Sequence, residues 1–168
     1  MMCAAELSKL PEGVQRVVAF LQSAGHTQQP RMLVDAARTA QQAADALGVE
    51  LGQIAKSIVF RRKSDDAAVL VITSGDKRVD ELKVQALVCE EGAKLGRADP
   101  EFVKLKTGFT IGGVAPVGHL IKPVTLVDKE LFRFETVWAA AGHPNAVFEI
   151  TPLALHGFTS APVADVVL

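Results

Sequence analysis

The sequence predicts an α+β fold with a mixed β-sheet, and two observations support this. Short apolar, β-branched runs come in pairs joined by polar turns, as antiparallel strands do. Segments with helical spacing of apolar residues are scattered among these pairs instead of alternating strictly with single strands. This order favours an α+β domain over a strictly alternating parallel fold.

The N-terminal part of the chain predicts two regular helices. Over residues 11–24, apolar residues recur every three or four positions, behind an opening proline and ahead of a glycine. We therefore expect an N-terminal helix at about 11–24. A second helix is expected from Thr39 to Gly48, because Thr39 and Gln42 have the spacing of a capping box.

A buried hairpin follows, with strands at Ser57–Phe60 and Ala67–Thr73, so that it begins just after Lys56. Beyond it, Asp80–Val88 and a segment from Asp99 to about Gly108 have helical character. The remaining expected elements are a structured loop at 108–119, strands at 124–127, 136–141 and 146–150, a helical turn from Lys129, a tight turn at 142–145, and a last helix capped by Thr151.

Composition points to one globular domain spanning residues 1–168. Hydrophobic residues make up 49% and charged residues 22%, enough apolar content for a packed core. The apolar runs are far shorter than the roughly 20 residues of a membrane helix, so we expect a cytoplasmic protein without a membrane partner. Cys3 and Cys89 have neither disulfide nor metal-ligand spacing, and we expect both to be bystanders.

The charge balance restricts how the protein could meet a nucleic acid. Lys and Arg total 18 against 19 Asp and Glu, which excludes the global positive field that drives non-specific binding. Any such contact must therefore be local. Basic residues cluster at 61–63, at 77–78 and at Lys104 and Lys106, although each cluster alone also fits a solvated surface.

Lys56 is the first candidate for chemistry. It stands at the entrance of the apolar run Ile58–Phe60, where its ammonium group could be partly shielded and still reach a cleft. A fixed cation there could hold a phosphate or polarise an ester carbonyl. The alternative is an edge-strand lysine whose head group reaches water.

The segment Ile111–His119 is the second candidate. Gly112, Gly113 and Gly118 would let backbone N–H groups approach a ligand and line an oxyanion or ester pocket. A tight connection between two sheet segments explains the same glycines equally well. The segment has neither the Gly-Lys-Ser/Thr of a phosphate-binding loop nor dinucleotide-fold spacing.

The four histidines do not have the spacing of a metal site, and we expect no metal or other cofactor. His119 and His143 each follow a loop glycine. A role in acid–base chemistry or substrate contact is open for both, as is simple turn capping.

Taken in order, these segments resemble the YbaK/ProX family of prolyl-tRNA editing domains and free-standing deacylases. The resemblance runs from about Ala37 to Val167. It is carried by 37–40, 43–44 and 47–49, by Ile54-Ala55-Lys56-Ser57, by Thr73-Ser74-Gly75 with 78–80, by Gly96-Arg97-Ala98, by 107–119, and by 138–145 with Leu153.

The resemblance implies a curved mixed sheet, or pseudo-barrel, flanked by helices, and hydrolysis of a mischarged aminoacyl-tRNA. Lys56 would be the key lysine, in contact with the terminal nucleotide or the ester. A glycine-rich pocket loop would contain Gly112, Gly113, Pro116 and Gly118, with His119 and His143 as further substrate contacts. The implied partners are the 3′ end of tRNA and prolyl-tRNA synthetase, with no DNA.

One departure bears on specificity. Family members that act on cysteinyl-tRNA have an aspartate in the strand after the late glycine turn, where this chain has Val147. The expected substrate therefore carries a small or hydroxylated side chain, such as that of alanine, serine, threonine or a non-protein analogue. The alternative to an enzyme is a non-catalytic module that binds a tRNA end, an amino acid or a synthetase, and a blocked or displaced lysine would mark it.

Overall fold

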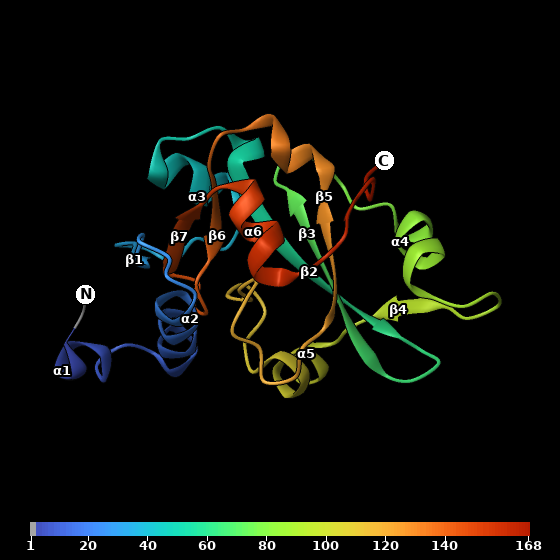
Figure 1. Ribbon diagram of the computed structural model, residues 1–168, viewed down its shortest axis with the longest axis horizontal. Coiled ribbons are helices and arrows are strands. Elements are labelled where there is room, and N and C mark those ends of the chain that lie inside the picture. Colours follow the sequence, from blue (N-terminus) through green and yellow to red (C-terminus); the bar gives the residue numbers. More distant parts are fainter. Residues whose placement is uncertain (1–2) are drawn as a thin grey trace.

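The centre of the fold is the antiparallel hairpin of β2 (Ile54–Arg62) and β3 (Ala67–Ser74), seen crossing the middle of the computed structural model in Figure 1. The structure describes residues 3–168. β3 is buried along most of its length, because both of its faces are covered. The other strands are added on both sides of this hairpin, beside β2 on one side and beside β3 on the other.

Within the described residues the sheet has eight strands, in the order β1-β7-β6-β2-β3-β5-β8, with β4 also paired to β2. Parallel pairs join β2 to β6, β3 to β5 and β5 to β8, while the other pairs are antiparallel. The further strands are β1 (Arg31–Met32), β4 (Leu95–Arg97), β5 (Val124–Asp128), β6 (Val137–Ala140), β7 (Ala146–Ile150) and β8 (Val163–Ala164). The predicted α+β class with a mixed sheet is confirmed.

The expected start of the hairpin was wrong. β2 begins at Ile54, so Lys56 lies inside the strand and not ahead of it. The first two residues of β2, Ile54 and Ala55, pair in parallel with Trp138 and Ala139 of β6. This pairing spans more than eighty residues of chain, and the local pattern around Lys56 carries no trace of it.

β2 changes partners along one of its edges. It pairs with β6 only at Ile54 and Ala55, and with β4 only at Phe60–Arg62. Between these two contacts the residues 56–59 pair with β3 on the other edge alone. The sheet is therefore split at this point.

The helices begin and end close to where the sequence predicts. α2 (Glu12–Ser23) matches the expected N-terminal helix, and α3 (Ala40–Leu47) has the expected capping box between Thr39 and Gln42. The others are α1 (Ala4–Leu7), α4 (Glu81–Val88), α5 (Pro100–Thr107) and α6 (Pro152–Thr159), with short 3₁₀ turns η1 (Leu51–Gln53) and η2 (Lys129–Arg133).

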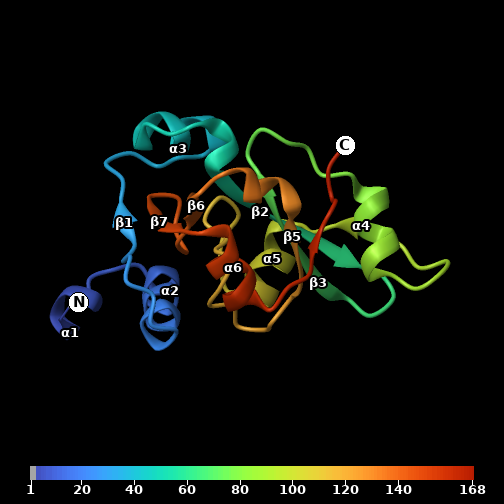
Figure 2. The same ribbon diagram turned by 45° about the horizontal axis from the view of Figure 1, so that its top comes forward.

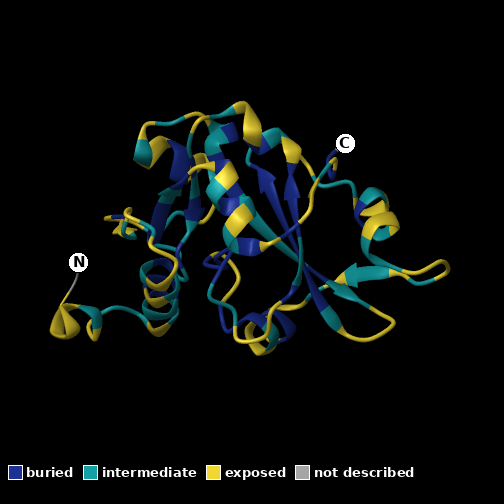
Figure 3. Cartoon of the chain, viewed as in Figure 1, coloured by how far each residue is buried: buried dark blue, intermediate teal, exposed yellow. Residues whose placement is uncertain are grey.

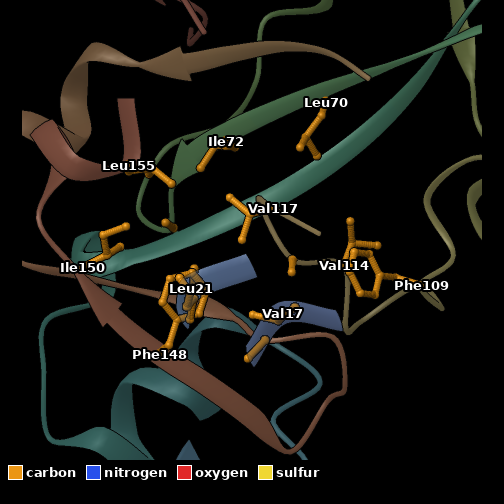
Figure 4. Close-up of a cluster of buried hydrophobic side chains, with 14 of the residues drawn as sticks. Val17, Leu21, Leu70, Ile72, Phe109, Val114, Val117, Phe148, Ile150 and Leu155 are labelled. Carbon is orange, nitrogen blue, oxygen red and sulfur yellow. The ribbon is translucent and has the colours of Figure 1, made fainter. Parts of the chain in front are cut away.

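Hydrophobic side chains pack on both faces of the sheet. On one face, α2 and α6 cover Leu70 and Ile72 of β3 and the residues of β7, as Figure 4 shows. On the other face, Val69 and Val71 pack with Val84 of α4 and with the C-terminal segment. Figure 3 shows β3 and β5 as the buried strands between these layers.

A third, smaller cluster joins α3 to the sheet. Ala43 and Ala44 of α3 pack against Ile54 of β2 and Trp138 of β6. In the turned view of Figure 2, α3 comes forward over this part of the sheet. α3 therefore stands beside the point at which β2 and β6 separate.

Among the described residues, none of the helices has both the length and the apolar character needed to cross a membrane.

Candidate functional site

A pocket of about 280 Å³ lies where β2 and β6 separate. Its walls come from both strands, from the segment leading into α3, from the loop after α5 and from the turn before β7. Small apolar side chains dominate them, among which seven are alanines: Ala37, Ala40, Ala43, Ala55, Ala139, Ala140 and Ala146. The volume is slightly below the ~300 Å³ at which pockets for drug-sized ligands begin, so the pocket suits a small group.

Lys56 lines this pocket and also a second, more open one. Its Nζ atom donates a hydrogen bond to the Lys77 carbonyl oxygen at 3.0 Å, which fixes the ammonium group. Partial burial lowers the pKa of Lys56 below its ordinary value of 10.5, and the carboxylates of Asp76 and Asp128 oppose this shift. The site thus holds a positive charge that water only partly shields.

The carboxylates near Lys56 belong to a hydrogen-bonded network. Asp128 is fully buried, and its Oδ2 atom accepts hydrogen bonds from the Thr73 hydroxyl and the Ser74 amide. Arg133 binds both carboxylate oxygens of Asp76 and holds its pKa below the usual range. The sequence analysis singled out neither carboxylate, because they meet Lys56 only through the fold.

The second pocket, here called the basic groove, is about 260 Å³ and continues from Lys56 along one face of β2. Ile58, Phe60 and Val79 give it an apolar floor. Lys77 and Arg78 add positive charge beside that of Lys56, and Glu81 is the one acidic residue in its wall. Basic residues beside an apolar floor suit a nucleotide, whose base is apolar on its faces and whose phosphate is anionic.

The loop of residues 108–119, here called the glycine loop, contributes Ile111, Gly112 and Val114 to the small pocket. Gly112 has a φ of +94°, a conformation that side chains disfavour. The Gly113 amide donates to the Thr110 carbonyl within the loop, so it is not free to bind a substrate. Of the predicted glycines, Gly112 is therefore the one in the pocket wall.

His143 lies in the turn of residues 142–145, here called the late turn, next to Pro144, which lines the pocket. Its Nδ1 atom accepts a hydrogen bond from the Asn145 amide at 3.1 Å, so its proton resides on Nε2 when the ring is neutral. The Gly113 backbone abuts the His143 backbone. His143 therefore lies behind the pocket wall and is not among the residues that line the pocket.

Pro116, Gly118 and His119 lie elsewhere. They line a separate pocket of about 230 Å³, and its other walls include Phe20, Phe158, Lys122, Pro123 and Thr125. The His119 Nε2 atom bonds to the Ala115 carbonyl at 2.7 Å, and burial lowers the pKa of the ring to about 4. These three residues hold the far end of the glycine loop and do not reach the pocket that Lys56 lines.

Other pocket residues were not named as candidates. Arg38 and Thr39 form the rim before α3, and Trp138 and Val147 form the wall on β6 and β7. Only the pairing of β6 with β2 and β7 brings Trp138 and Val147 to the site. Val147, predicted to replace an aspartate of cysteine-specific relatives, gives that wall an apolar side chain.

The described part of the chain contains no group of three or more His, Cys, Asp or Glu residues that could hold a metal ion. Cys3 is exposed and Cys89 half-buried, and they are not joined in a disulfide. Neither lines the small pocket or the basic groove.

Comparison with known proteins identifies the family. A model of the aminoacyl-tRNA editing domain matches residues 34–158. The chain belongs to the aminoacyl-tRNA editing domain family. The predicted resemblance to YbaK-type deacylases is confirmed, and with it the hydrolase class.

Relatives of this editing domain include free-standing and fused forms. The uncharacterized protein YwhH of Bacillus subtilis (strain 168) is 38% identical over 74% of this chain and 77% of its own length. A proline–tRNA ligase of Maridesulfovibrio salexigens is 32% identical over 62% of this chain, which corresponds to 17% of the ligase. A crystal structure described as a candidate trans-editing enzyme for prolyl tRNA synthetase is 40% identical, covers 95% of this chain and 99% of its own, and superposes with a TM-score of 0.87.

Proposed function

We propose that this editing domain acts in trans and hydrolyses the ester bond of proline tRNA that carries a small wrong amino acid. The observation that carries the proposal is the place of Lys56, where a small apolar pocket meets a basic groove. An aminoacyl-tRNA end has the same two parts, a small acyl group joined to a nucleotide. The similarity to proline–tRNA ligases and to a candidate prolyl trans-editing enzyme supports proline tRNA.

In the proposed complex, the aminoacyl group occupies the small pocket and the terminal adenosine occupies the basic groove. The base would lie on Ile58, Phe60 and Val79, and the phosphate would meet Lys77 and Arg78. This places the ester next to the ammonium group of Lys56. Gly112 lines the pocket, so its backbone amide would face the acyl group.

The chemistry requires little beyond positioning and charge stabilisation. A water molecule adds through its oxygen to the ester carbonyl carbon, and the carbonyl oxygen becomes an oxyanion beside Lys56. The bond from that carbon to the ribose oxygen then breaks, and the proton lost by the water goes to that departing oxygen, which becomes the ribose hydroxyl. An aminoacyl ester is already activated, so a protein nucleophile is not needed.

The pocket walls indicate which amino acid is removed. Seven alanines and the apolar Val147 leave room for a small side chain and offer no carboxylate to a thiol. We propose alanine, serine or threonine as the substrate class, with cysteine disfavoured. A synthetase distinguishes such side chains by only about 1–3 kcal/mol, which is why a separate hydrolytic site is useful.

The second candidate function is a non-catalytic binding module. It predicts a lysine that is blocked or turned away from the pocket. Lys56 instead lines both pockets, and within residues 3–168 its ammonium group donates to one backbone carbonyl, which leaves two ammonium protons for a ligand. This observation favours the enzyme.

We propose that the substrate reaches the protein in the cytoplasm, with prolyl-tRNA synthetase as the partner that releases the mischarged tRNA. DNA and membranes have no part in the proposed function. The support is the match to proline–tRNA ligases, whose chain contains a similar domain.

The test is deacylation of proline tRNA charged separately with alanine, serine, threonine, cysteine and proline. The wild-type protein should release one or more of the small wrong amino acids and leave prolyl-tRNA intact. Lys56→Ala should lower kcat/KM by about a hundredfold or more, as loss of a group that stabilises an oxyanion does.

Lys129→Ala is the matched control, because Lys129 is exposed and lines neither the small pocket nor the basic groove. Its kcat/KM should equal that of the wild type. If the wild type releases none of the amino acids, with or without synthetase present, the enzyme proposal fails and the binding module takes its place.

A further inference from the structure

The glycine loop and the late turn both line the small pocket and touch each other. Gly112 comes from the first and Pro144 from the second. A Cβ atom on Gly113 would lie 2.8 Å from the His143 Cα atom, so the two backbones are in contact. A shift of either segment would therefore move the other and change the shape of the pocket.

Helix α2 contacts the late turn through two glycines. The backbone of Gly13 packs directly on that of Gly142, and a Cβ atom on either would overlap the carbonyl oxygen of the other. Gly142 also has a φ of +91°, which a side chain would strain. The same Gly13 lies against the ring of Phe109, which begins the glycine loop.

Arg16, one turn further along α2, contacts both ends of the glycine loop. Its Nε atom donates to the Gly118 carbonyl oxygen at 3.2 Å. Its Nη2 atom lies against Gly108, where a Cβ atom would approach it to 2.5 Å. Its guanidinium carbon is 4.6 Å from the centroid of the Phe109 ring. One planar group thus joins the loop's first residues to its last.

The Arg16 Nη2 atom is buried and has no hydrogen-bond partner within residues 3–168. Leaving a buried N–H group unpaired costs stability, so an apolar side chain would serve the packing of α2 better. The apolar face of α2 is already complete, since Val14, Val17, Val18 and Leu21 are fully buried. An arginine at this position is explained by its contacts with both ends of the glycine loop.

We infer that Arg16 is a positioning residue for the pocket, and that α2 sets the glycine loop against the late turn through Arg16 and Gly13. α2 lies before residue 34, where the match to the editing-domain model begins. Figure 4 shows Val17 and Leu21 of α2 in the same buried cluster as the loop residues Phe109, Val114 and Val117. The effect on catalysis rests on the proposed function, whereas the effect on the loop does not.

The test compares Arg16→Met, which keeps an unbranched stem but removes the guanidinium group, with Arg16→Lys and with the control Lys9→Met, which removes an exposed charge before α2. Three quantities are measured: the kinetics of deacylation, unfolding in urea, and hydrogen exchange of the amides in 109–118 against those of β3. We expect Arg16→Met to lower kcat/KM at least tenfold and to speed exchange in the loop at least tenfold, with β3 unchanged. Arg16→Lys should fall between, because lysine keeps the charge without the planar fork.

A second pair of variants keeps the test decisive if Arg16→Met folds poorly. Gly13→Ala places a Cβ atom against Gly142, whereas Gly157→Ala in α6 meets nothing within 4 Å. The first should speed loop exchange and the second should not. Loop exchange that stays normal in both Arg16→Met and Gly13→Ala, or that rises only in step with β3, overturns the inference.

The two proposals fail in different ways. A wild type that releases no amino acid removes the proposed function, while the exchange comparison still decides whether Arg16 positions the loop. If the wild type is active and the Arg16→Met variant keeps full kcat/KM, the inferred effect of Arg16 on catalysis is overturned.

Discussion

His119 links the stability of the glycine loop to pH. The ring is held between the Ala115 carbonyl and the Phe109 ring, and the Arg16 guanidinium adds to the burial that lowers its pKa to about 4. In the unfolded chain the same imidazole titrates at its ordinary value near 6.5. Between these two values the unfolded state binds more protons than the folded state, so acid favours unfolding.

Lowering the pH from 7 to 5 should therefore reduce the free energy of unfolding by about 2 kcal/mol through His119 alone. The measurement is urea unfolding at both pH values in the wild type and in His119→Gln, whose amide can still donate to Ala115. The part of the pH dependence lost in the variant belongs to His119. Equal pH dependence in the two proteins would contradict the assignment.

At this scale the sequence predicted residue types better than their roles. Lys56 and Gly112 were named from the sequence, and both line the small pocket. Pro116 and Gly118 were named with them from the resemblance to the family's glycine-rich loop, and His119 because it follows a loop glycine, yet all three line a separate pocket and Gly118 is bonded to Arg16 of α2. The positive φ of Gly118, +81°, is part of that turn and cannot be read from the glycine alone.

Helix α3 sets the size of the small pocket. Its first residue, Ala40, lines the pocket, whereas Ala46 of the same helix is exposed and lines a different hollow. Ala40→Leu should fill part of the space and lower kcat/KM for threonine more than for alanine, by about tenfold, since added bulk in a packed pocket costs of order 1–3 kcal/mol.

Ala46→Leu is the matched control, with the same change one turn and a half further along α3. It should leave the ratio of threonine to alanine hydrolysis unchanged. If Ala40→Leu also leaves that ratio unchanged, the side chain of the substrate does not occupy the pocket beside α3.

The elements differ in how much of their position is local. α2, α3, α4, α5 and α6 are each preceded by the proline or polar residue that the sequence predicts, because a cap acts within one turn of chain. The beginning of β2 depends instead on β6, and the short strands β1, β4 and β8 exist only through their partners. Long-range pairing is what the local pattern could not supply.

The whole molecule carries a formal net charge of −1, so its affinity for tRNA must come from a few local contacts. In the proposed complex Lys77 and Arg78 meet the phosphate and Lys56 faces the ester, so about two phosphate contacts are available. The logarithm of the binding constant should then fall with the logarithm of salt concentration with a slope of about −1.4. Fluorescence binding of uncharged proline tRNA across a salt series would measure it.

Lys77→Ala combined with Arg78→Ala should bring that slope towards zero, and Lys129→Ala should leave it as it is. A slope much steeper than −3 in the wild type would show that the tRNA contacts a larger basic surface than the groove.

Where the sheet splits along β2, an edge of main chain faces the pocket. Side-chain substitutions cannot easily remove this edge, because its polar groups belong to the backbone. Residues 56–59 have a strand neighbour on one side only, so N–H and C=O groups of the main chain border the pocket on the other. Every aminoacyl ester carries the same amino and carbonyl groups, whatever its side chain. A main-chain edge binds these shared atoms whatever side chains line the pocket. Substitution of the surrounding alanines in related proteins would therefore change which amino acid fits, while the main-chain contacts to its ester remain.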